Sequence, residues 1–195
     1  SLVRVEFGGV PYNQAMEPAI ELYNEYYGGM AGILFQEIRE ARALAYSVGA
    51  LYVNGERKGD SNLMLSAVGT QADKTVEALG ALIGLIDDLP VSPDRFKSAK
   101  GSLENNYRTE RIGFRSILGS VQSWERKGLS IDPRAIRFEK IKRSTIDDIV
   151  DFHKKHIAKR PKLISIVGDR NKIDLDELSN YGKITELSAE DLFNF

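Results

Sequence analysis

Cysteine is absent from the 195 residues, and histidine occurs only twice. Without cysteine the chain can form no disulfide, and it offers no thiolate to bind zinc or attack a substrate. No apolar run approaches the roughly 18 residues that a membrane-spanning helix needs. A Gly-x-Ser-x-Gly motif is missing, and the one glycine-rich stretch, Gly28 to Gly32, lacks the lysine of a P-loop. These absences argue against a small disulfide-bonded protein, a membrane-spanning protein, a serine hydrolase and a P-loop nucleotide-binding protein.

An excess of charge of one sign is also missing. The 27 Lys and Arg nearly balance the 28 Asp and Glu, so the formal net charge is −1. No basic stripe dominates, so we expect no nucleic-acid partner, and no membrane contact is indicated. Hydrophobic residues make up 42% of the chain. This content is ordinary for a globular protein and too high for a disordered one.

The first residues have the pattern of a strand. Val3, Val5 and Phe7 alternate with Arg4 and Glu6, the period of a half-buried strand. The basic and apolar segments of a signal peptide are not present there. We therefore expect the chain to be a piece cut from a longer one.

Strands and helices are predicted along the whole chain from periodicity, capping residues and turns. Strands are expected at residues 2–7, 45–53, 62–69 and 163–168. Helices are expected at 14–42 with a break at Gly28 and Gly29, from Thr70, from Ser92, at 114–126, 133–142 and 144–157, and in a short turn at 188–191. This order predicts an α+β fold in which one mostly antiparallel or mixed sheet has helices packed on one face. We expect one domain, residues 1–168, with a tail at 169–195 packed on it.

The two histidines are the first candidates for a metal site. His153 and His156 are three residues apart on a predicted helix, so they share a face. The intervening lysines would repel a cation, and no third ligand is indicated. We expect an exposed helix face rather than a zinc site, and no metal site elsewhere in the chain.

The segment from Phe35 to Val48 carries the strongest chemical signal. It runs from the end of a helix directly into a strand, with Arg39 in the last helical turn and Tyr46 at the start of the strand. A guanidinium and a phenol at one sheet edge could together donate hydrogen bonds to a carbonyl group. The alternative is an arginine on a helix surface and a tyrosine in the core.

This segment resembles the C-terminal half-domain of the pitrilysin-type (M16) zinc metallopeptidases. The matching residues are GGMAGILFQEIRE at 28–40 followed by LAYSV at 44–48, and they resemble the family text S-R-L-F-x-E-[IL]-R-E-K-R-G-L-A-Y-S-V. The resemblance extends over about residues 2–168. It implies half-domains that pair, with two halves enclosing a chamber.

The family resemblance also implies a site shared between domains. The zinc motif, His-x-x-Glu-His, belongs to another domain of the complete enzyme, so this chain needs no cofactor of its own and would be inactive alone. Zinc-bound water attacks the peptide carbonyl, Tyr46 would donate to the developing oxyanion, and Arg39 would hold a substrate backbone carbonyl. The peptide substrate is expected to add a strand to a sheet edge.

Two departures from the family pattern matter. Ala43 stands where glycine is usual, which implies a backbone angle that alanine tolerates. The zinc motif is missing, so the chain is a fragment, one subunit of a two-chain enzyme, or a degenerate member. The alternative function is a non-catalytic scaffold or processing-partner subunit. In either case we expect a dimer or pairing with an M16 domain that carries His-x-x-Glu-His. A bacterial periplasmic or cytoplasmic location is left open.

Overall fold

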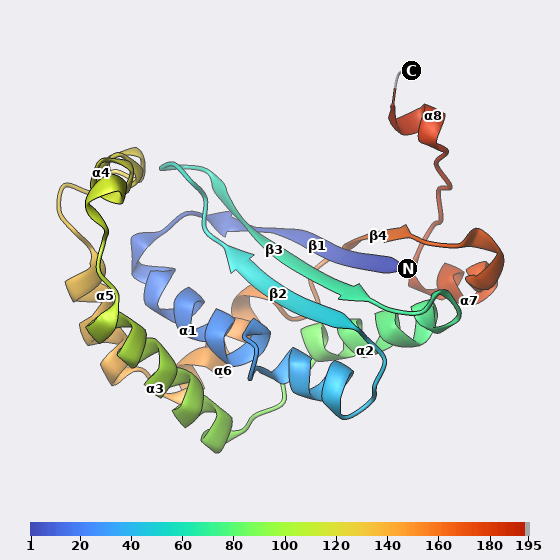
Figure 1. Ribbon diagram of the computed structural model, residues 1–195, viewed down its shortest axis with the longest axis horizontal. Coiled ribbons are helices and arrows are strands. Elements are labelled where there is room, and N and C mark those ends of the chain that lie inside the picture. Colours follow the sequence, from blue (N-terminus) through green and yellow to red (C-terminus); the bar gives the residue numbers. More distant parts are fainter. Residues whose placement is uncertain (194–195) are drawn as a thin grey trace.

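The computed structural model describes residues 1–193. Its centre is a four-stranded sheet in the order β2-β3-β1-β4, in which every neighbouring pair is antiparallel. The strands are β1 (Leu2–Pro11), β2 (Ser47–Val53), β3 (Ser61–Gly69) and β4 (Leu163–Val167). Strands β2 and β4 are therefore the two edges, and the predicted antiparallel sheet is confirmed (Figure 1).

Side-chain alternation explains which face of the sheet is covered. Val3, Val5 and Phe7 of β1 are buried, and Arg4 between them is exposed. Met64 and Val68 of β3 follow the same rule. Residues two apart on a strand share a face, so one face of the sheet forms the core and the other meets solvent.

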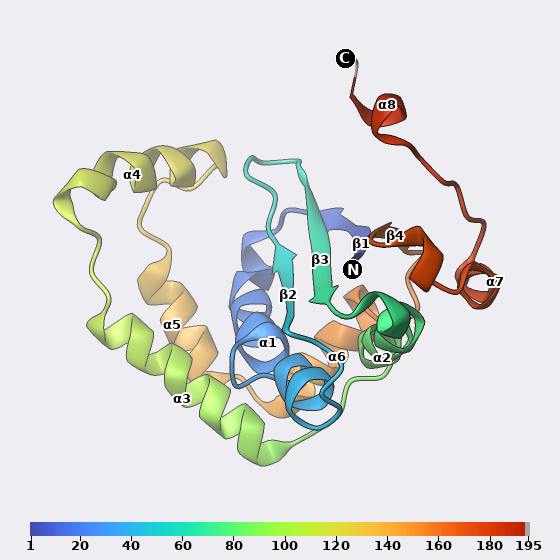
Figure 2. The ribbon, with the colours of Figure 1, turned by 45° about the vertical axis from the view of Figure 1, so that its right-hand side comes forward.

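The helices gather on the core face, as the sequence predicts (Figures 1 and 2). They are α1 (Glu17–Gly28), α2 (Thr75–Asp87), α3 (Pro93–Thr109), α5 (Arg134–Arg143) and α6 (Ile146–His156), and α4 (Ile117–Arg126) lies at the end of the molecule near the β2–β3 turn. The caps follow from the sequence. Ser92 accepts a bond from the Arg95 amide at the start of α3, and the capping box of α6 is Thr145 with Asp148.

Beyond β4 the chain first packs on the body and then leaves it. Ile173 and Leu178, the latter in α7 (Leu175–Leu178), are buried in the core cluster. From Gly182 to Phe193 every residue is exposed, including α8 (Ala189–Leu192). Both ribbon views show this segment extending away from the sheet (Figures 1 and 2). The domain boundary expected at residue 168 stays a prediction.

No helix within the described residues is both long and apolar enough to cross a bilayer.

Candidate functional site

The helix that carries Arg39 is wider than an α-helix. Residues Phe35–Glu40 form a π-helix, in which the Ala41 amide donates to the Gln36 carbonyl oxygen five residues earlier, at 2.9 Å. Ile38 anchors this turn in the core, while Arg39 beside it is exposed. Single π-turns occur often at functional sites because they change the direction in which side chains leave a helix.

The helix ends in a Schellman arrangement centred on Ala43. The Leu44 amide donates to the Ile38 carbonyl and the Ala43 amide to the Arg39 carbonyl, both at 3.1 Å. Ala43 has a φ of +50°, in the left-handed region that favours glycine. Alanine is accommodated at this angle as the sequence suggests, but at a cost in strain, because the six-to-one hydrogen bond requires a left-handed residue at this position.

Arg39 is held by its own helix. Its guanidinium carbon lies 4.7 Å from the centroid of the Phe35 ring, and its Nε is 3.9 Å from Glu40 Oε1. Both contacts are at the protein surface, so each is weak and replaceable. The guanidinium is therefore free to exchange them for an acceptor on another molecule.

Tyr46 lies immediately before the edge strand β2 and is 88% exposed. Its amide donates to the Gly69 carbonyl oxygen at 2.9 Å, which fixes the backbone. Tyr46 lines a surface hollow of about 640 Å³ together with Arg42, Lys74 and Glu77. Arg39 does not line this hollow, so the structure presents the guanidinium and the phenol to solvent separately rather than in contact.

The outer edge of β2 is covered along part of its length. The Asn24 side chain of α1 accepts a bond from the Tyr52 amide at 2.8 Å and donates to the Tyr52 carbonyl at 3.0 Å. Gly28, at the end of α1, lies so close that a Cβ there would be 1.9 Å from the Ala50 carbonyl oxygen. An added peptide strand would therefore have to pair near Val48, at the end of β2 next to Tyr46.

The histidines do not form the exposed face expected of them. His153 is only 3% exposed, and its Nε2 lies 2.9 Å from the Ile86 carbonyl oxygen. Burial lowers the pKa of His153, and burial also lowers the pKa of His156. The His156 ring is tilted by 40° against the Phe152 ring, with 5.1 Å between their centroids. The exposed-face prediction failed because α6 turns this side toward α1 and α2. Across residues 1–193, no three His, Asp or Glu side chains are grouped so that they could hold a metal ion.

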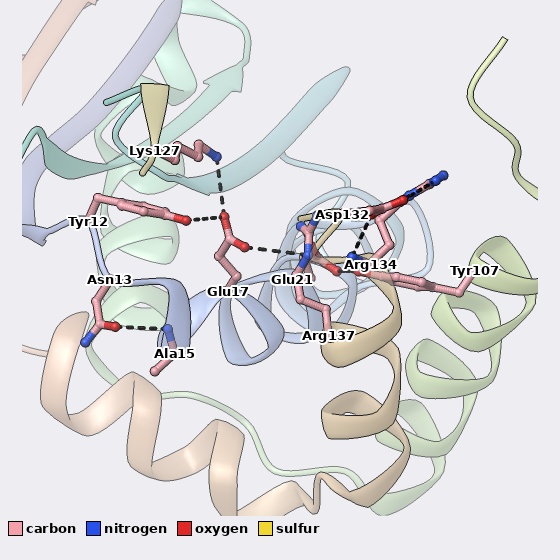
Figure 3. A network of polar contacts seen from close by, with 10 residues as sticks. All are labelled: Tyr12, Asn13, Ala15, Glu17, Glu21, Tyr107, Lys127, Asp132, Arg134 and Arg137. Carbon is pink, nitrogen blue, oxygen red and sulfur yellow. Dashed lines mark hydrogen bonds and ion pairs between the residues drawn. The ribbon is translucent and has the colours of Figure 1, made fainter. Parts of the chain in front are cut away.

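A buried carboxylate network was not predicted (Figure 3). Glu17, 2% exposed, accepts hydrogen bonds from the Tyr12 hydroxyl at 3.0 Å and from Lys127 Nζ at 3.4 Å. Arg137 Nε lies 3.5 Å from the same carboxylate, and its Nη1 donates to Glu21 Oε1 at 2.5 Å.

The Tyr107 hydroxyl completes the network by donating to the other Glu21 oxygen at 2.5 Å. These contacts join α1 to α3, to α5 and to the end of α4. The partners lie 86 to 116 residues from Glu21 along the chain, so no local pattern could have shown them.

Comparisons with known proteins agree with this architecture. A family model described as the peptidase M16 inactive domain matches residues 6–103, which is 98 of the 195 residues. No sequence among the curated proteins matches the chain.

Solved structures share the fold. A peptidase M16 inactive domain from Pseudomonas fluorescens is 17% identical with a TM-score of 0.67, over 84% of this chain and 39% of that one. The inactive peptidase domain of a candidate zinc protease from Bordetella parapertussis is 13% identical with a TM-score of 0.68. The match covers 87% of this chain and 93% of the Bordetella chain. A chain of complex III2 from Candida albicans is 16% identical with a TM-score of 0.60. The match covers 84% of this chain and 42% of the Candida chain.

The present chain thus spans about two fifths of the Pseudomonas chain. These identities are low, and the structures show likeness of fold. The family match over half of the sequence is the finding that assigns the protein: the chain belongs to the peptidase M16 inactive-domain family.

Proposed function

We propose that this chain is the substrate-binding, transition-state-stabilising half-domain of an M16 zinc endopeptidase. Its partner would be a domain or subunit that carries the His-x-x-Glu-His zinc motif. The observation that carries the proposal is Tyr46. Its phenol is 88% exposed at the start of an edge strand, and its hydroxyl has no hydrogen-bond partner among residues 1–193.

The phenol is suited to stabilise an oxyanion. Its hydroxyl group is a hydrogen-bond donor. The hydrogen bond from the Tyr46 amide to the Gly69 carbonyl oxygen fixes the backbone from which the phenol extends. One such donor aimed at a developing oxyanion contributes on the order of 10²–10³ in rate. Zinc bound by the partner would supply the activated water.

Arg39 is assigned to the substrate backbone. Its guanidinium has surface contacts only with Phe35 and Glu40, which a substrate carbonyl can displace. Because Arg39 and Tyr46 do not share one hollow, we assign them to different carbonyl groups of an extended peptide. The peptide would pair with the Val48 end of β2, since Asn24 and Gly28 cover the rest of that edge.

The test is Tyr46→Phe in the assembled enzyme, with Tyr181→Phe as the matched control. Tyr181 is also partly exposed but lies beyond β4. Tyr46→Phe should lower kcat by roughly 10²-fold or more with KM nearly unchanged. The control should leave both constants within twofold, and Arg39→Gln should chiefly raise KM. Turnover by Tyr46→Phe within twofold of wild type would remove the catalytic assignment.

A second candidate is a non-catalytic scaffold subunit. The similarity of fold to a complex III2 chain from Candida albicans favours it. In that case Tyr46→Phe would change neither peptide hydrolysis nor assembly. Full activity of a partner subunit in the absence of this chain would decide for the scaffold.

A further inference from the structure

The backbone around the hollow beside Tyr46 is tied together at two points. The Thr70 hydroxyl donates to the Leu44 carbonyl oxygen at 2.6 Å, and the Tyr46 amide donates to the Gly69 carbonyl oxygen at 2.9 Å. Leu44 is only 8% exposed, so the turn that leads into β2 is anchored in the core. These contacts hold this turn against the segment that joins β3 to α2, which lines the hollow from the other side (Figure 1).

The charged side chains that line this hollow are Arg42, Lys74 and Glu77. Lys74 Nζ lies 3.3 Å from Glu77 Oε2, so these two charges compensate each other. The Arg42 guanidinium has no ion pair or hydrogen bond in the described part of the chain. Ser1 also lines the hollow, but its amino group donates to the Thr70 carbonyl oxygen at 2.7 Å, as a backbone amide would, and is not counted as a free cation. Two cations and one anion leave a net charge of +1, carried by an unpaired guanidinium.

The hollow has the size of a subsite for a substrate side chain. Its volume is about 640 Å³, within the roughly 300–1,000 Å³ of ligand sites. The peptide proposed above pairs with the Val48 end of β2, with the bond to be cleaved at Tyr46, so the residues that flank this bond pass over the hollow. Successive side chains of an extended peptide point to opposite faces. One of the two flanking residues can therefore place its side chain in the hollow.

An unpaired guanidinium favours a carboxylate as its ligand. Its planar fork of N–H donors matches the two oxygens of a carboxylate, whereas an amide side chain offers one oxygen and an alkyl side chain offers none. A basic side chain would be repelled by Arg42 and would have to displace Lys74 from Glu77. The charges of the hollow thus select for acidic side chains and against basic ones.

We propose that this hollow is the specificity pocket for an acidic side chain next to the cleaved bond, and that Arg42 binds its carboxylate. The substrate class is therefore peptides with Asp or Glu at one of the two positions that flank the bond. This inference rests on the proposed function, because the hollow borders that bond only if Tyr46 faces it. The C-terminal carboxylate of a peptide has the same chemistry, so the experiment separates the two sources.

The experiment compares cleavage of matched peptides by the assembled enzyme. Each flanking position in turn is Glu, Gln or Lys, and every peptide is amidated at its C-terminus. At one of the two positions kcat/KM should be about fivefold higher for Glu than for Gln, as expected for an exposed ion pair, and lowest for Lys. A Gln peptide with a free C-terminus is the arm that tests the terminal carboxylate. Equal values for Glu and Gln at both positions, or a gain only from the free C-terminus, would overturn the proposal.

Substitution of Arg42 tests its role in the preference. Arg42→Gln should bring the ratio of kcat/KM between the Glu and Gln peptides to about one, and Arg42→Glu should make the Lys peptide the better substrate. Arg57→Gln is the matched control, because Arg57 is also an exposed arginine without an ion pair in the described residues but lies in the turn between β2 and β3, outside the hollow. Circular dichroism confirms that each variant is folded. A preference that survives in Arg42→Gln, or that is lost equally in Arg57→Gln, would contradict the assignment.

The failure of this inference can be told from the failure of the proposed function. A Tyr46→Phe enzyme that keeps full turnover and still prefers Glu would refute the oxyanion role and leave the pocket intact. An assembled enzyme that depends on Tyr46 but cleaves the Glu and Gln peptides equally would refute the pocket alone. If the assembly hydrolyses no peptide, NMR titration of the full chain decides. The amide signals of residues 42–47 should shift more with the Glu peptide than with the Gln peptide, and equal shifts or none would overturn the inference.

Discussion

Replacing Ala43 with glycine should stabilise the protein. Ala43 is exposed and has a φ of +50°, so its methyl group contributes strain and little burial. A non-glycine residue in the left-handed region costs roughly 1–2 kcal/mol. Glycine also increases the conformational entropy of the unfolded chain, which lowers the free energy of unfolding by about 0.4–1 kcal/mol. The free energy of unfolding should therefore rise by about 0.5–1 kcal/mol, which for a chain of this size raises Tm by roughly 1–4 °C.

The matched control is Ala41→Gly, two residues earlier. Ala41 is also exposed, but its φ of −78° is helical, so glycine relieves no strain there. The free energy of unfolding of the Ala41→Gly variant should fall by about 0.5–1 kcal/mol. Urea unfolding followed by circular dichroism measures both values. If Ala43→Gly is destabilising, or if both variants change stability equally, the Schellman strain argument is refuted.

Two further perturbations test the packing of α1 and α6. Gly28→Ala should lower the free energy of unfolding by about 1–3 kcal/mol, because its Cβ would lie 1.9 Å from the Ala50 carbonyl oxygen. Gly84→Ala is the control and should stabilise the protein, because the space around Gly84 is open. Equal effects of the two substitutions in calorimetry would contradict this reasoning. The folded-state pKa of His153 is lowered by burial, so protonation favours the unfolded chain and stability is lost as pH falls below about 6.5. His153→Gln should flatten the fall in unfolding free energy between about pH 7 and about pH 5, and an unchanged slope would show that His153 does not contribute.

Local patterns predicted the elements of the fold well. Alternation in β1, the Ser92 and Pro93 signal at α3 and the glycine break after α1 depend on neighbours in sequence, and each appears in the structure. The helix expected from residue 144 begins slightly later, as α6 at Ile146, with Thr145 as its cap. Such shifts arise because adjacent Ser and Thr residues can both cap.

The site was predictable only in part. The Phe35 to Val48 segment is continuous, so Arg39 and Tyr46 could be placed at a helix end and a strand start from sequence. Whether their side chains meet depends on the π-turn and on the left-handed Ala43, which no periodicity shows. His153 was misread as exposed because its burial comes from the docking of α6, which is a long-range contact.

The network around Glu17 sets how the outer helices can move. Helix α4 has no buried residue, and α3 and α5 have one each, Ala99 and Ile141. Ionic and hydroxyl contacts to Glu17 and Glu21 thus replace much of the apolar packing that would otherwise fix these helices. Segments with few buried contacts open at lower free energy than the core. Helices α3, α4 and α5 should therefore move together relative to the sheet, and their amide protons should exchange before those of the strands. The width of the space beside α4 can then change without unfolding the sheet.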